Sequence, residues 1–373
     1  MKIKYCFILN YAPHYRKEIL ERIDTEFDCI FFVGDKTYTP IKKLDFSHFK
    51  NKVKELPFVR LFKRFYTLKG LISLTYRKYD IYVLTGQTYD VSSWFLLFLN
   101  KVIGRRTYIW NHGLYGHETS IQKRFKKLQF NLCSGYFLYG NFAKKLMIDE
   151  GYTPDKLHVI YNSLEYKYQK QLRGQLQISS VYQNYFKDQA PVLIFIGRLT
   201  AVKKLEMLIE TVKLLKDEDI KVNCVLIGDG LQRDNLKEMA VKKGIESNVW
   251  FYGACYDEPI LAELVYNASI CVSPGNIGLT AIHSLMYGCP AITHNNFIQQ
   301  MPEVESIEEG VTGAFFEYDS TISLKETIKK WLQQYPIKEK KIIDNCFSII
   351  DERYNPVYQI SKLKAILYEN TSD

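Results

Sequence analysis

The chain has 373 residues, of which 47% are hydrophobic and 24% are charged. This length predicts about two domains, each able to bury its own core. Because no apolar run is long enough to span a membrane, the composition favours a soluble globular protein. The eight cysteines form no CxxC pair, which indicates free thiols in a reducing cytoplasm and argues against a disulfide framework or a zinc site.

Positive charge is concentrated at the front of the chain. Residues 1–165 hold 27 Lys and Arg against 15 Asp and Glu. Between Lys50 and Lys78 the basic residues are interleaved with aromatic ones, namely Phe58, Phe62, Phe65, Tyr66 and Tyr76. A solvated helix face and a surface for anionic lipid headgroups are both consistent with this pattern. No segment resembles a nucleic-acid-binding module, so we expect no nucleic-acid partner.

Short apolar runs alternate with helical patterns in the first half of the chain. The runs predict strands at Lys4–Leu9, Cys29–Val33, Ile81–Leu84, Thr107–Trp110, Gly135–Tyr139 and Leu157–Ile160. The helical patterns lie at Arg16–Ile23, Phe62–Tyr76, Ser92–Ile103, Ile121–Leu132 and Gly140–Glu150. Alternation of this kind predicts a parallel sheet with helices on both faces.

A second α/β series follows a polar stretch at Tyr166–Gln189 that we interpret as a domain linker. Strands are expected at Val192–Ile196, Val222–Ile227, Val249–Tyr252, Ala268–Ser273, Pro290–Thr293 and Gly313–Phe316. Two similar halves predict a ligand cleft that faces the carboxyl ends of the strands.

The segment Ser273–Thr293 is the most informative of the second half. Its glycines, Gly275 and Gly278, allow backbone N–H groups to approach a ligand, and a helix predicted at Leu279–Tyr287 adds unpaired donors. The pattern predicts a phosphate cradle, with a tight βα turn packed on the sheet as the alternative.

Two further strand ends in this half carry glycine. Gly197 and Arg198 follow one strand, and Lys203 lies just before the next helix, where a cation is unfavourable unless an anion binds beside it. Gly228 and Gly230 follow the next strand.

The fingerprint GxGxxG is absent after the first strand of the chain, which argues against an oxidoreductase. The acidic triplet 217–219 falls at a charged helix end, so we expect no metal.

A polar loop follows the strand Thr107–Trp110. It holds Asn111, His112, His117 and Glu118 among glycines. His112 can donate a hydrogen bond to a substrate or act as an acid or base, whereas an ordinary hydrogen-bonded histidine is the alternative.

Taken in order, these segments resemble the large retaining glycosyltransferase family 4, also called glycosyl transferases group 1. The resemblance rests on GYTPDKLHVIYNSLEY, FIGRLTAVKKLEMLI, VLIGDGLQRDNL, VWFYGACYDE, SPGNIGLTAIHSLMYGCPAIT, the pair Pro302-Glu303, and EEGVTGAFFE. It implies an α/β GT-B fold of two Rossmann-like, doubly wound domains facing a central cleft. The implied domains are an acceptor domain at 1–180, a nucleotide-sugar domain at 190–352, and a C-terminal segment at 353–373 whose helix packs back on the first domain.

The resemblance also implies roles for individual residues. His112 and Glu303 would be catalytic. The donor diphosphate would lie against Gly197, Arg198, Lys203, Gly278, Leu279 and Thr280. The sugar, ribose and base would contact Gly228, Gly230, Tyr256, Gly275, Asn276 and His283. The acceptor would contact Tyr15, Arg16, Asn111, His117 and Glu118.

The implied reaction moves a hexose or deoxyhexose from a nucleotide-diphosphate sugar to a glycan or polyprenyl-linked oligosaccharide. It would retain the anomeric configuration, need no metal or cofactor, and serve surface polysaccharide synthesis such as that of capsule, O-antigen or exopolysaccharide. The protein would work in the cytoplasm or at the inner face of the cytoplasmic membrane, with its basic N-terminal domain towards anionic lipid.

The chain departs from the family pattern at two positions. Members usually carry two glutamates seven residues apart, where this chain has Gly275 and His283. A deoxy sugar, or a sugar contact rerouted through Asn276 or Glu303, would fit this change. A nucleotide-sugar epimerase on the same fold and a non-catalytic nucleotide-sugar-binding paralogue are the alternatives.

Overall fold

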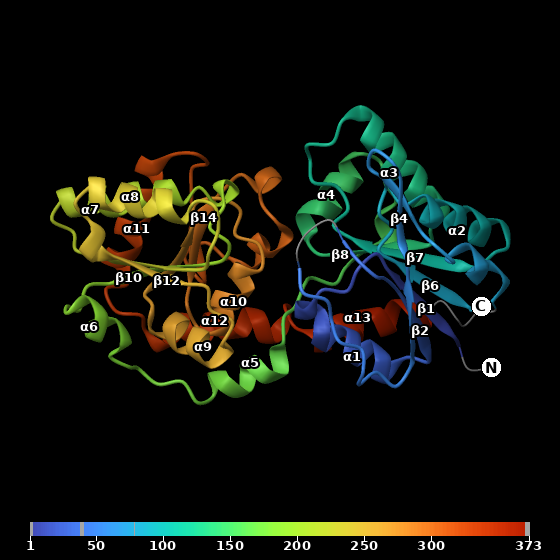
Figure 1. The fold of residues 1–373 in the computed structure, drawn as a ribbon, viewed down its shortest axis with the longest axis horizontal. Coiled ribbons are helices and arrows are strands. Elements are labelled where there is room, and N and C mark those ends of the chain that lie inside the picture. Colours follow the sequence, from blue (N-terminus) through green and yellow to red (C-terminus); the bar gives the residue numbers. More distant parts are fainter. Residues whose placement is uncertain (1–2, 38–40, 78, 370–373) are drawn as a thin grey trace. The chain divides into compact units, whose positions relative to one another are not determined.

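The computed structural model describes residues 3–37, 41–77 and 79–369. The chain divides into two compact units. Unit 1 comprises residues 1–165 together with 355–373, and unit 2 comprises residues 166–354. Each unit contains one parallel sheet covered by helices on both faces, which confirms the predicted α/β class (Figure 1).

Unit 1 is built on a seven-stranded parallel sheet in the order β3-β2-β1-β6-β7-β8-β9. Its strands are β1 Tyr5–Leu9, β2 Cys29–Gly34, β3 Lys52–Leu56, β6 Ile81–Leu84, β7 Arg106–Asn111, β8 Gly135–Leu138 and β9 Leu157–Val159. Six of these confirm predicted strands. The edge strand β3 was not predicted, because its sequence KVKEL is charged and mostly exposed.

Side chains that alternate along β1 build two separate cores on the two faces of this sheet. Tyr5, Phe7 and Leu9 pack with α1 (Lys17–Glu26) and α13 (Pro356–Glu369). Cys6 and Ile8 pack on the opposite face, towards α2 (Val91–Val102). Helices α3 (Ser120–Leu132) and α4 (Asn141–Asp149) extend the layer that contains α2 (Figure 1).

The helix predicted at Phe62–Tyr76 is wrong. The segment forms an antiparallel hairpin of β4 (Phe58–Phe62) and β5 (Phe65–Leu68), followed by the short 3-10 helix η2 (Ile72–Tyr76). Tyr66 and Leu68 are buried while Phe65 is exposed, which is the period-two pattern of a strand. Lys63 adopts a positive φ of 49° at the turn between the two strands. The side chain of Tyr76 lies outside the described residues, as does Lys78.

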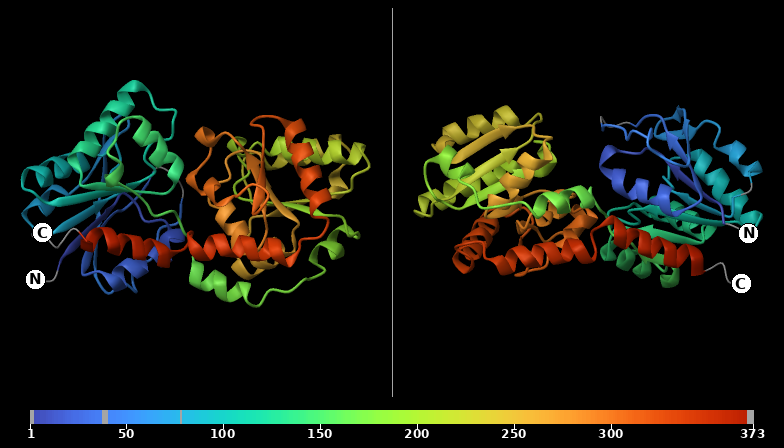
Figure 2. Two further views of the ribbon diagram at one scale, coloured as in Figure 1. Left: turned by 180° about the vertical axis from the view of Figure 1, so that it is seen from behind. Right: turned by 90° about the horizontal axis from the view of Figure 1, so that it is seen from below.

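Unit 2 contains a six-stranded parallel sheet in the order β12-β11-β10-β13-β14-β15. All six strands confirm predicted ones: β10 Val192–Ile196, β11 Asn223–Ile227, β12 Val249–Gly253, β13 Ile270–Ser273, β14 Ala291–His294 and β15 Gly313–Phe316. One face is covered by α7 (Leu205–Asp217), α8 (Arg233–Lys242) and α11 (Thr321–Gln334). The other is covered by α9 (Glu258–Asn267), α10 (Thr280–Met286) and α12 (Lys340–Glu352), as Figures 1 and 2 show.

The segment expected to be a linker contains two helices, α5 (Tyr166–Arg173) and α6 (Val181–Phe186). Both belong to unit 2. The Tyr182 hydroxyl donates to the Leu264 carbonyl oxygen at 2.6 Å, and Arg173 forms an ion pair with Asp351 at 2.8 Å. The Tyr- and Gln-rich composition that suggested a linker instead supplies polar anchors to α9 and α12.

The last helix, α13, lies in unit 1 as expected. It packs beside α1, and Lys364 of α13 forms an ion pair with Glu26. Gln359 donates to the Tyr161 carbonyl oxygen at 2.8 Å and accepts from the Ser163 hydroxyl at 2.6 Å. Within the described ranges, no helix combines the length and apolarity needed to cross a membrane.

Candidate functional site

The three glycine-marked strand ends of unit 2 lie together, because β11, β10 and β13 are neighbours in the sheet. The Gly197 N–H donates to the Ile227 carbonyl oxygen at 2.9 Å, which joins the ends of β10 and β11. On the other side, the Thr280 hydroxyl donates to the Ile196 carbonyl oxygen at 2.9 Å, which joins the start of α10 to the end of β10. Segments separated by 84 residues therefore form one edge of the sheet.

Glycine is required at position 228 for this close approach. A Cβ there would lie 1.8 Å from the carbonyl oxygen of Gly197, and Gly228 has a φ of 143°. Gly230 is similarly placed, since its Cβ would lie 2.4 Å from the Leu199 carbonyl oxygen. These two glycines therefore hold the loop after β11 directly against the loop after β10.

Gly275 also occupies a position where no side chain fits. Its Cβ would lie 2.0 Å from the Val202 carbonyl oxygen and 2.7 Å from the Lys203 Cα. Its N–H donates to the Lys203 carbonyl oxygen at 2.9 Å. The loop after β13 therefore packs backbone to backbone on the segment that carries Lys203, and a glutamate at position 275 would require a different backbone.

Lys203 reaches the same loop with its side chain. Its Nζ donates to the carbonyl oxygen of Asn276 at 2.6 Å and to the Oδ1 of Asn276 at 2.9 Å. Burial and the nearby charge of Arg198 lower the pKa of Lys203, the charge of Glu303 opposes them, and the resulting pKa is about 8. Arg198 is exposed, and its guanidinium makes no hydrogen bond or ion pair with the described residues. The structure thus brings Arg198, Lys203, Asn276 and Glu303 together.

The rest of the predicted donor set is distributed around this loop. Glu303 is buried, with 3% of its surface exposed. Gln300 links the loop after β13 to the strand β14. Its Oε1 accepts from the Ile277 N–H at 2.9 Å, and its Nε2 donates to the Thr293 hydroxyl at 2.8 Å. Gly278 has a φ of 55°, Leu279 is partly exposed, and Tyr256 is 92% exposed.

One carboxylate of this edge was missed in the sequence. Glu258, the first residue of α9, accepts three hydrogen bonds at Oε1: from Gln169 Nε2 at 2.8 Å, His283 Nε2 at 2.9 Å and the Tyr287 hydroxyl at 2.6 Å. Burial raises the pKa of Glu258, but its hydrogen bond and charge interaction with His283 outweigh burial, and the pKa falls to about 2. Its place after Tyr256 in VWFYGACYDE was the available signal, whereas its partners lie on α5, on α10 and directly after α10.

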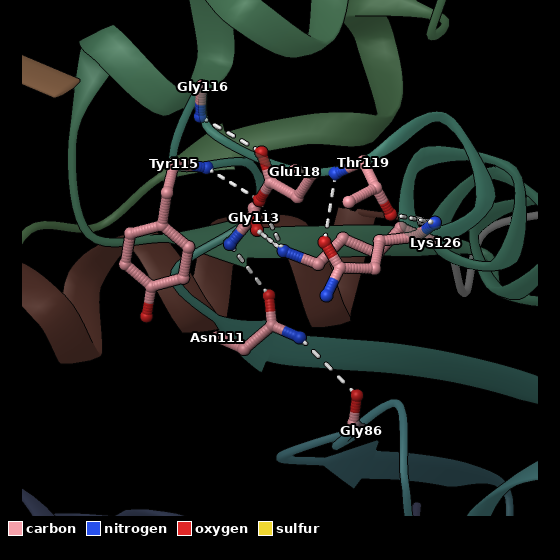
Figure 3. Close-up of polar contacts among 9 residues, drawn as sticks. Gly86, Asn111, Gly113, Tyr115, Gly116, Glu118, Thr119 and Lys126 are labelled. Atoms are coloured by element: carbon pink, nitrogen blue, oxygen red, sulfur yellow. Dashed lines mark hydrogen bonds and ion pairs between the residues drawn. The ribbon is translucent and has the colours of Figure 1, made fainter.

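In unit 1, Asn111 and Glu118 organise the loop that follows β7 (Figure 3). Asn111 Oδ1 accepts from the Gly113 N–H at 2.8 Å, and its Nδ2 donates to the Gly86 carbonyl oxygen at 3.5 Å. Glu118 accepts from the backbone N–H groups of Tyr115 and Gly116 and from Lys126 Nζ. Burial raises the pKa of Glu118, but these hydrogen bonds outweigh burial and leave the pKa lowered. Both residues therefore have defined roles in shaping the loop.

Arg16 packs against β7, the strand that precedes His112. The Arg16 guanidinium lies 4.3 Å from the ring centroid of Trp110, and 8% of the residue is exposed. Burial and the charges of Arg16 and Lys126 together lower the pKa of His112 to about 4, so the imidazole is neutral at pH 7. Its Nδ1 is buried and has no hydrogen-bond partner among the described residues.

His112 also lines a small cavity of about 70 Å³. Lys126, Gln129 and Tyr152 line the same cavity, and the sequence did not suggest Gln129 or Tyr152. Gln129 Nε2 and the Tyr152 hydroxyl are buried without a described hydrogen-bond partner. A buried polar group is normally satisfied, so this cavity is suited to a polar ligand group or ordered water.

The remaining predicted residues of unit 1 lie nearby. Tyr15 is half-buried, with its ring edge-on to His14 at 5.7 Å, and His117 is exposed, with its ring 5.5 Å from Tyr115.

In unit 2, Glu218 of the acidic triplet is paired with Lys325 and Lys329 on the surface. Among the described residues, no group of His, Cys, Asp and Glu side chains has the arrangement of a metal site.

Two doubly wound parallel sheets, with a C-terminal helix returned to the first unit, define a GT-B fold. Solved structures share it over nearly the whole chain. A glycosyltransferase from Rickettsia africae matches with a TM-score of 0.75 and 16% identity, covering 100% of this chain and 99% of that one. The Anabaena protein Alr3699/HepE in complex with UDP matches with a TM-score of 0.72 and 15% identity, covering 99% and 100%.

Sequence comparison finds a match to a family model in unit 2. Residues 181–347 match the model described as glycosyl transferases group 1, the family that the sequence resembles. The matched segment covers less than half of the chain and lies within unit 2. An uncharacterized 41.2 kDa protein in the cps region of Klebsiella pneumoniae is 24% identical over 52% of this chain and 49% of its own length. The chain thus spans about half the length of the curated relatives that it matches.

Proposed function

We propose that the protein is a glycosyltransferase that uses a nucleotide-diphosphate sugar as donor. The observation that carries the proposal is the convergence of three glycine-marked strand ends with Arg198 and Lys203 at one edge of the unit 2 sheet. Ligands of open α/β sheets bind outside the carboxyl ends of the strands. Guanidinium and ammonium groups are the usual partners of phosphate oxygens.

In this proposal Arg198 and Lys203 neutralise the diphosphate as it leaves the sugar. Lys203 is already oriented by Asn276, so it needs little reorganisation when charge develops on the leaving group. The N–H groups of Gly197, Gly228 and Gly230 donate to groups within the protein. The phosphates would therefore bind the backbone N–H groups at the start of α10, from Gly278 to Thr280. Glu303, which is close enough to influence the pKa of Lys203, would contact the sugar.

We assign recognition of the ribose to Glu258. Carboxylates accept hydrogen bonds from ribose hydroxyls in nucleotide-binding folds. Gln169, His283 and Tyr287 all donate to Oε1 of Glu258, so Oε2 has no hydrogen-bond partner among the described residues, and the side chain is 23% exposed. His283, first expected to contact the ribose itself, would instead position Glu258.

His112 would serve the reacting sugar as a neutral hydrogen-bonding group. A pKa of about 4 makes it a weak base at neutral pH, so it suits polarisation of a hydroxyl better than full removal of a proton. Front-face transfer with retention of configuration needs charge stabilisation more than a strong protein base. None of the described carboxylates lines the cavity beside His112, which is consistent with a reaction that needs no strong protein base.

A lipid surface is the second partner that we propose, because two neighbouring helices of unit 1 expose an apolar face. On α2 the exposed side chains are Val91, Phe95, Phe98 and Val102, and on α3 they are Ile121, Phe125 and Leu128. Their spacing of three and four residues places each set on one side of its helix. The two sets meet where Trp94 contacts the ring of Phe125 at 6.2 Å. We call these seven side chains the α2–α3 face.

Charge on the same helices favours an anionic bilayer. Helix α3 contains four cations, Lys123, Arg124, Lys126 and Lys127, and α2 contains Lys101, whereas neither helix has an acidic residue. An apolar helix face flanked by lysine and arginine is typical of helices that lie in the membrane interface. Contact with a membrane would fit a glycan or polyprenyl-linked oligosaccharide as acceptor and a role in surface polysaccharide synthesis.

The proposal is tested by incubating the full chain with a panel of nucleotide sugars, with and without a membrane extract as acceptor source. Acceptor-dependent release of a nucleoside diphosphate is expected, with a loss of about tenfold or more in Arg198→Ala and Lys203→Ala. Conversion of the donor sugar to an epimer without acceptor would instead identify an epimerase. Failure to bind any nucleotide or nucleotide sugar would contradict both a glycosyltransferase and an epimerase.

A further inference from the structure

A second and larger cavity lies in unit 1 beneath the β4–β5 hairpin. Its volume is about 460 Å³, which falls within the range of small-molecule sites, about 300–1,000 Å³. This cavity was not predicted, because the hairpin that forms its wall was expected to be a helix. We call it the hairpin pocket, and it is lined by four cations: Lys36, Arg60, Lys63 and Arg64.

These four cations are not neutralised by the protein. No acidic residue lines the hairpin pocket, and none of the four forms an ion pair with a described carboxylate. The nearby Asp35 instead accepts from the Phe58 N–H at 2.8 Å. Like charges gathered in a concave site raise the local positive potential and attract anions.

Tyr89 forms part of the pocket wall. Hydrogen bonds from Gln122 and Arg64, together with the charges of Arg64 and Lys126, lower the pKa of Tyr89 and outweigh the raising effect of burial. Phe58 and Tyr66 complete an aromatic wall, with their rings stacked at 4.6 Å. The hairpin is held in place because the Tyr66 N–H donates to the Tyr89 carbonyl oxygen at 3.1 Å.

The position of the hairpin pocket connects it to His112. Asn10 follows β1, Lys36 follows β2 and Gln87 follows β6, and these three strands are neighbours in the sheet. The pocket therefore opens at the carboxyl edge, where ligands of parallel sheets bind. Gln87 lines both this pocket and the cavity beside His112, so a ligand held in one lies next to the other.

The hairpin tip adds an apolar element. Leu61, Phe62 and Phe65 are 53%, 65% and 43% exposed, and they flank Lys63 and Arg64 of the pocket wall. A ligand that fits both features has an anionic group next to a hydrocarbon chain.

We propose that the hairpin pocket binds the phosphate group of a lipid-linked acceptor, while the apolar tip contacts its hydrocarbon chain. The inference rests on the proposed glycosyl transfer, which it deepens by naming the chemical class of the acceptor. The phosphate would be held by Arg60, Lys63 and Arg64, and the acceptor hydroxyl would then lie towards Gln87 and His112.

The test measures binding of farnesyl phosphate to the full chain by titration calorimetry, with farnesol and inorganic phosphate as comparison ligands. We expect farnesyl phosphate to bind at least about tenfold more tightly than either, since the two features of the site act together. Equal affinity for farnesol would overturn the phosphate contact. Equal affinity for inorganic phosphate would overturn the lipid-linked source.

Variants then locate the site. R60Q combined with K63Q is expected to weaken farnesyl phosphate binding about tenfold or more, and Lys36→Gln, in a separate segment, is expected to weaken it independently. The matched control, K52Q with K54Q, removes the same charge from exposed positions of β3 outside the pocket and should leave binding unchanged. Unchanged binding in R60Q/K63Q with an unchanged melting temperature would contradict the proposal.

A donor-side variant separates this inference from the proposed function. Arg198→Ala should bind farnesyl phosphate like the wild type while losing nucleotide affinity. Nucleotide binding without farnesyl phosphate binding would overturn only the hairpin pocket. Absence of nucleotide binding in the wild type would overturn the proposed glycosyl transfer, and this inference with it.

Discussion

Lys203 Nζ lies 2.6 Å from the carbonyl oxygen of Asn276, so this cation is tied to the loop that precedes α10. This contact places an ammonium group in a partly buried position next to Arg198, and its pKa falls to about 8. The proposed diphosphate site therefore depends on a lysine that titrates near neutral pH.

Affinity for a nucleoside diphosphate should accordingly depend on pH. Lys203 is cationic below pH 8 and neutral above, and a bound diphosphate requires the cation. Affinity is therefore expected to fall as the pH rises above 8, by up to about tenfold per pH unit. Calorimetric titrations between pH 6.5 and 9.5 measure this, and Lys203→Arg, which stays charged, should remove the dependence. Identical pH profiles in both proteins would contradict the role of Lys203.

Gly275 should tolerate no side chain. A Cβ would lie 2.0 Å from the Val202 carbonyl oxygen, so Gly275→Ala is expected to lower the free energy of unfolding by about 2 kcal/mol or more. Gly275→Glu, which introduces the residue that the resemblance led us to expect, should destabilise further and increase no activity. Gly174→Ala is the matched control, because its Cβ would make only ordinary contacts, 3.5 Å or longer. Equal free energies of unfolding for the three variants, measured with denaturant, would contradict the close packing at Gly275.

Glu258 should distinguish ribose from deoxyribose. The wild type is expected to bind UDP, GDP or ADP, whichever it prefers, about tenfold more tightly than the 2′-deoxy form. Glu258→Gln should remove most of this difference by weakening only the ribonucleotide. Glu263→Gln, on the exposed side of the same helix, serves as control. A discrimination that survives Glu258→Gln would show that another group reads the hydroxyl.

The α2–α3 face should bind anionic vesicles. Co-sedimentation with phosphatidylglycerol-containing vesicles is expected to exceed that with neutral phosphatidylcholine. F98S combined with F125S should weaken it about tenfold or more, because two aromatic rings no longer enter the interface. V241S combined with I322S alters exposed apolar residues of unit 2 and should have no effect. Equal binding of both double variants would place the membrane contact elsewhere.

The sheets could be read from the sequence because buried parallel strands are short apolar runs bounded by turns. The runs at β10 and β13 illustrate this, since glycine or proline follows each one within a few residues. The residues Arg198, Lys203 and Asn276 were found because they lie next to those strand ends. Their mutual contacts follow from the order of strands in the sheet.

The features that were missed depend on contacts between distant segments. Glu258 is defined as a site residue by Gln169, His283 and Tyr287, which are between 25 and 89 residues away. The β4–β5 hairpin was read as a helix because its aromatic and basic residues recur at intervals that fit either structure. Only the burial of Tyr66 and Leu68 under α2 settles which one forms.

The measurement that tests the central claim most directly is a calorimetric comparison of nucleoside diphosphates with their monophosphates. We predict that one diphosphate binds the wild type at least about tenfold more tightly than its monophosphate, and that Arg198→Ala and Lys203→Ala each abolish this difference. Equal affinity for the diphosphate and the monophosphate, or a preference that survives both substitutions, would contradict a donor site at the strand ends of unit 2.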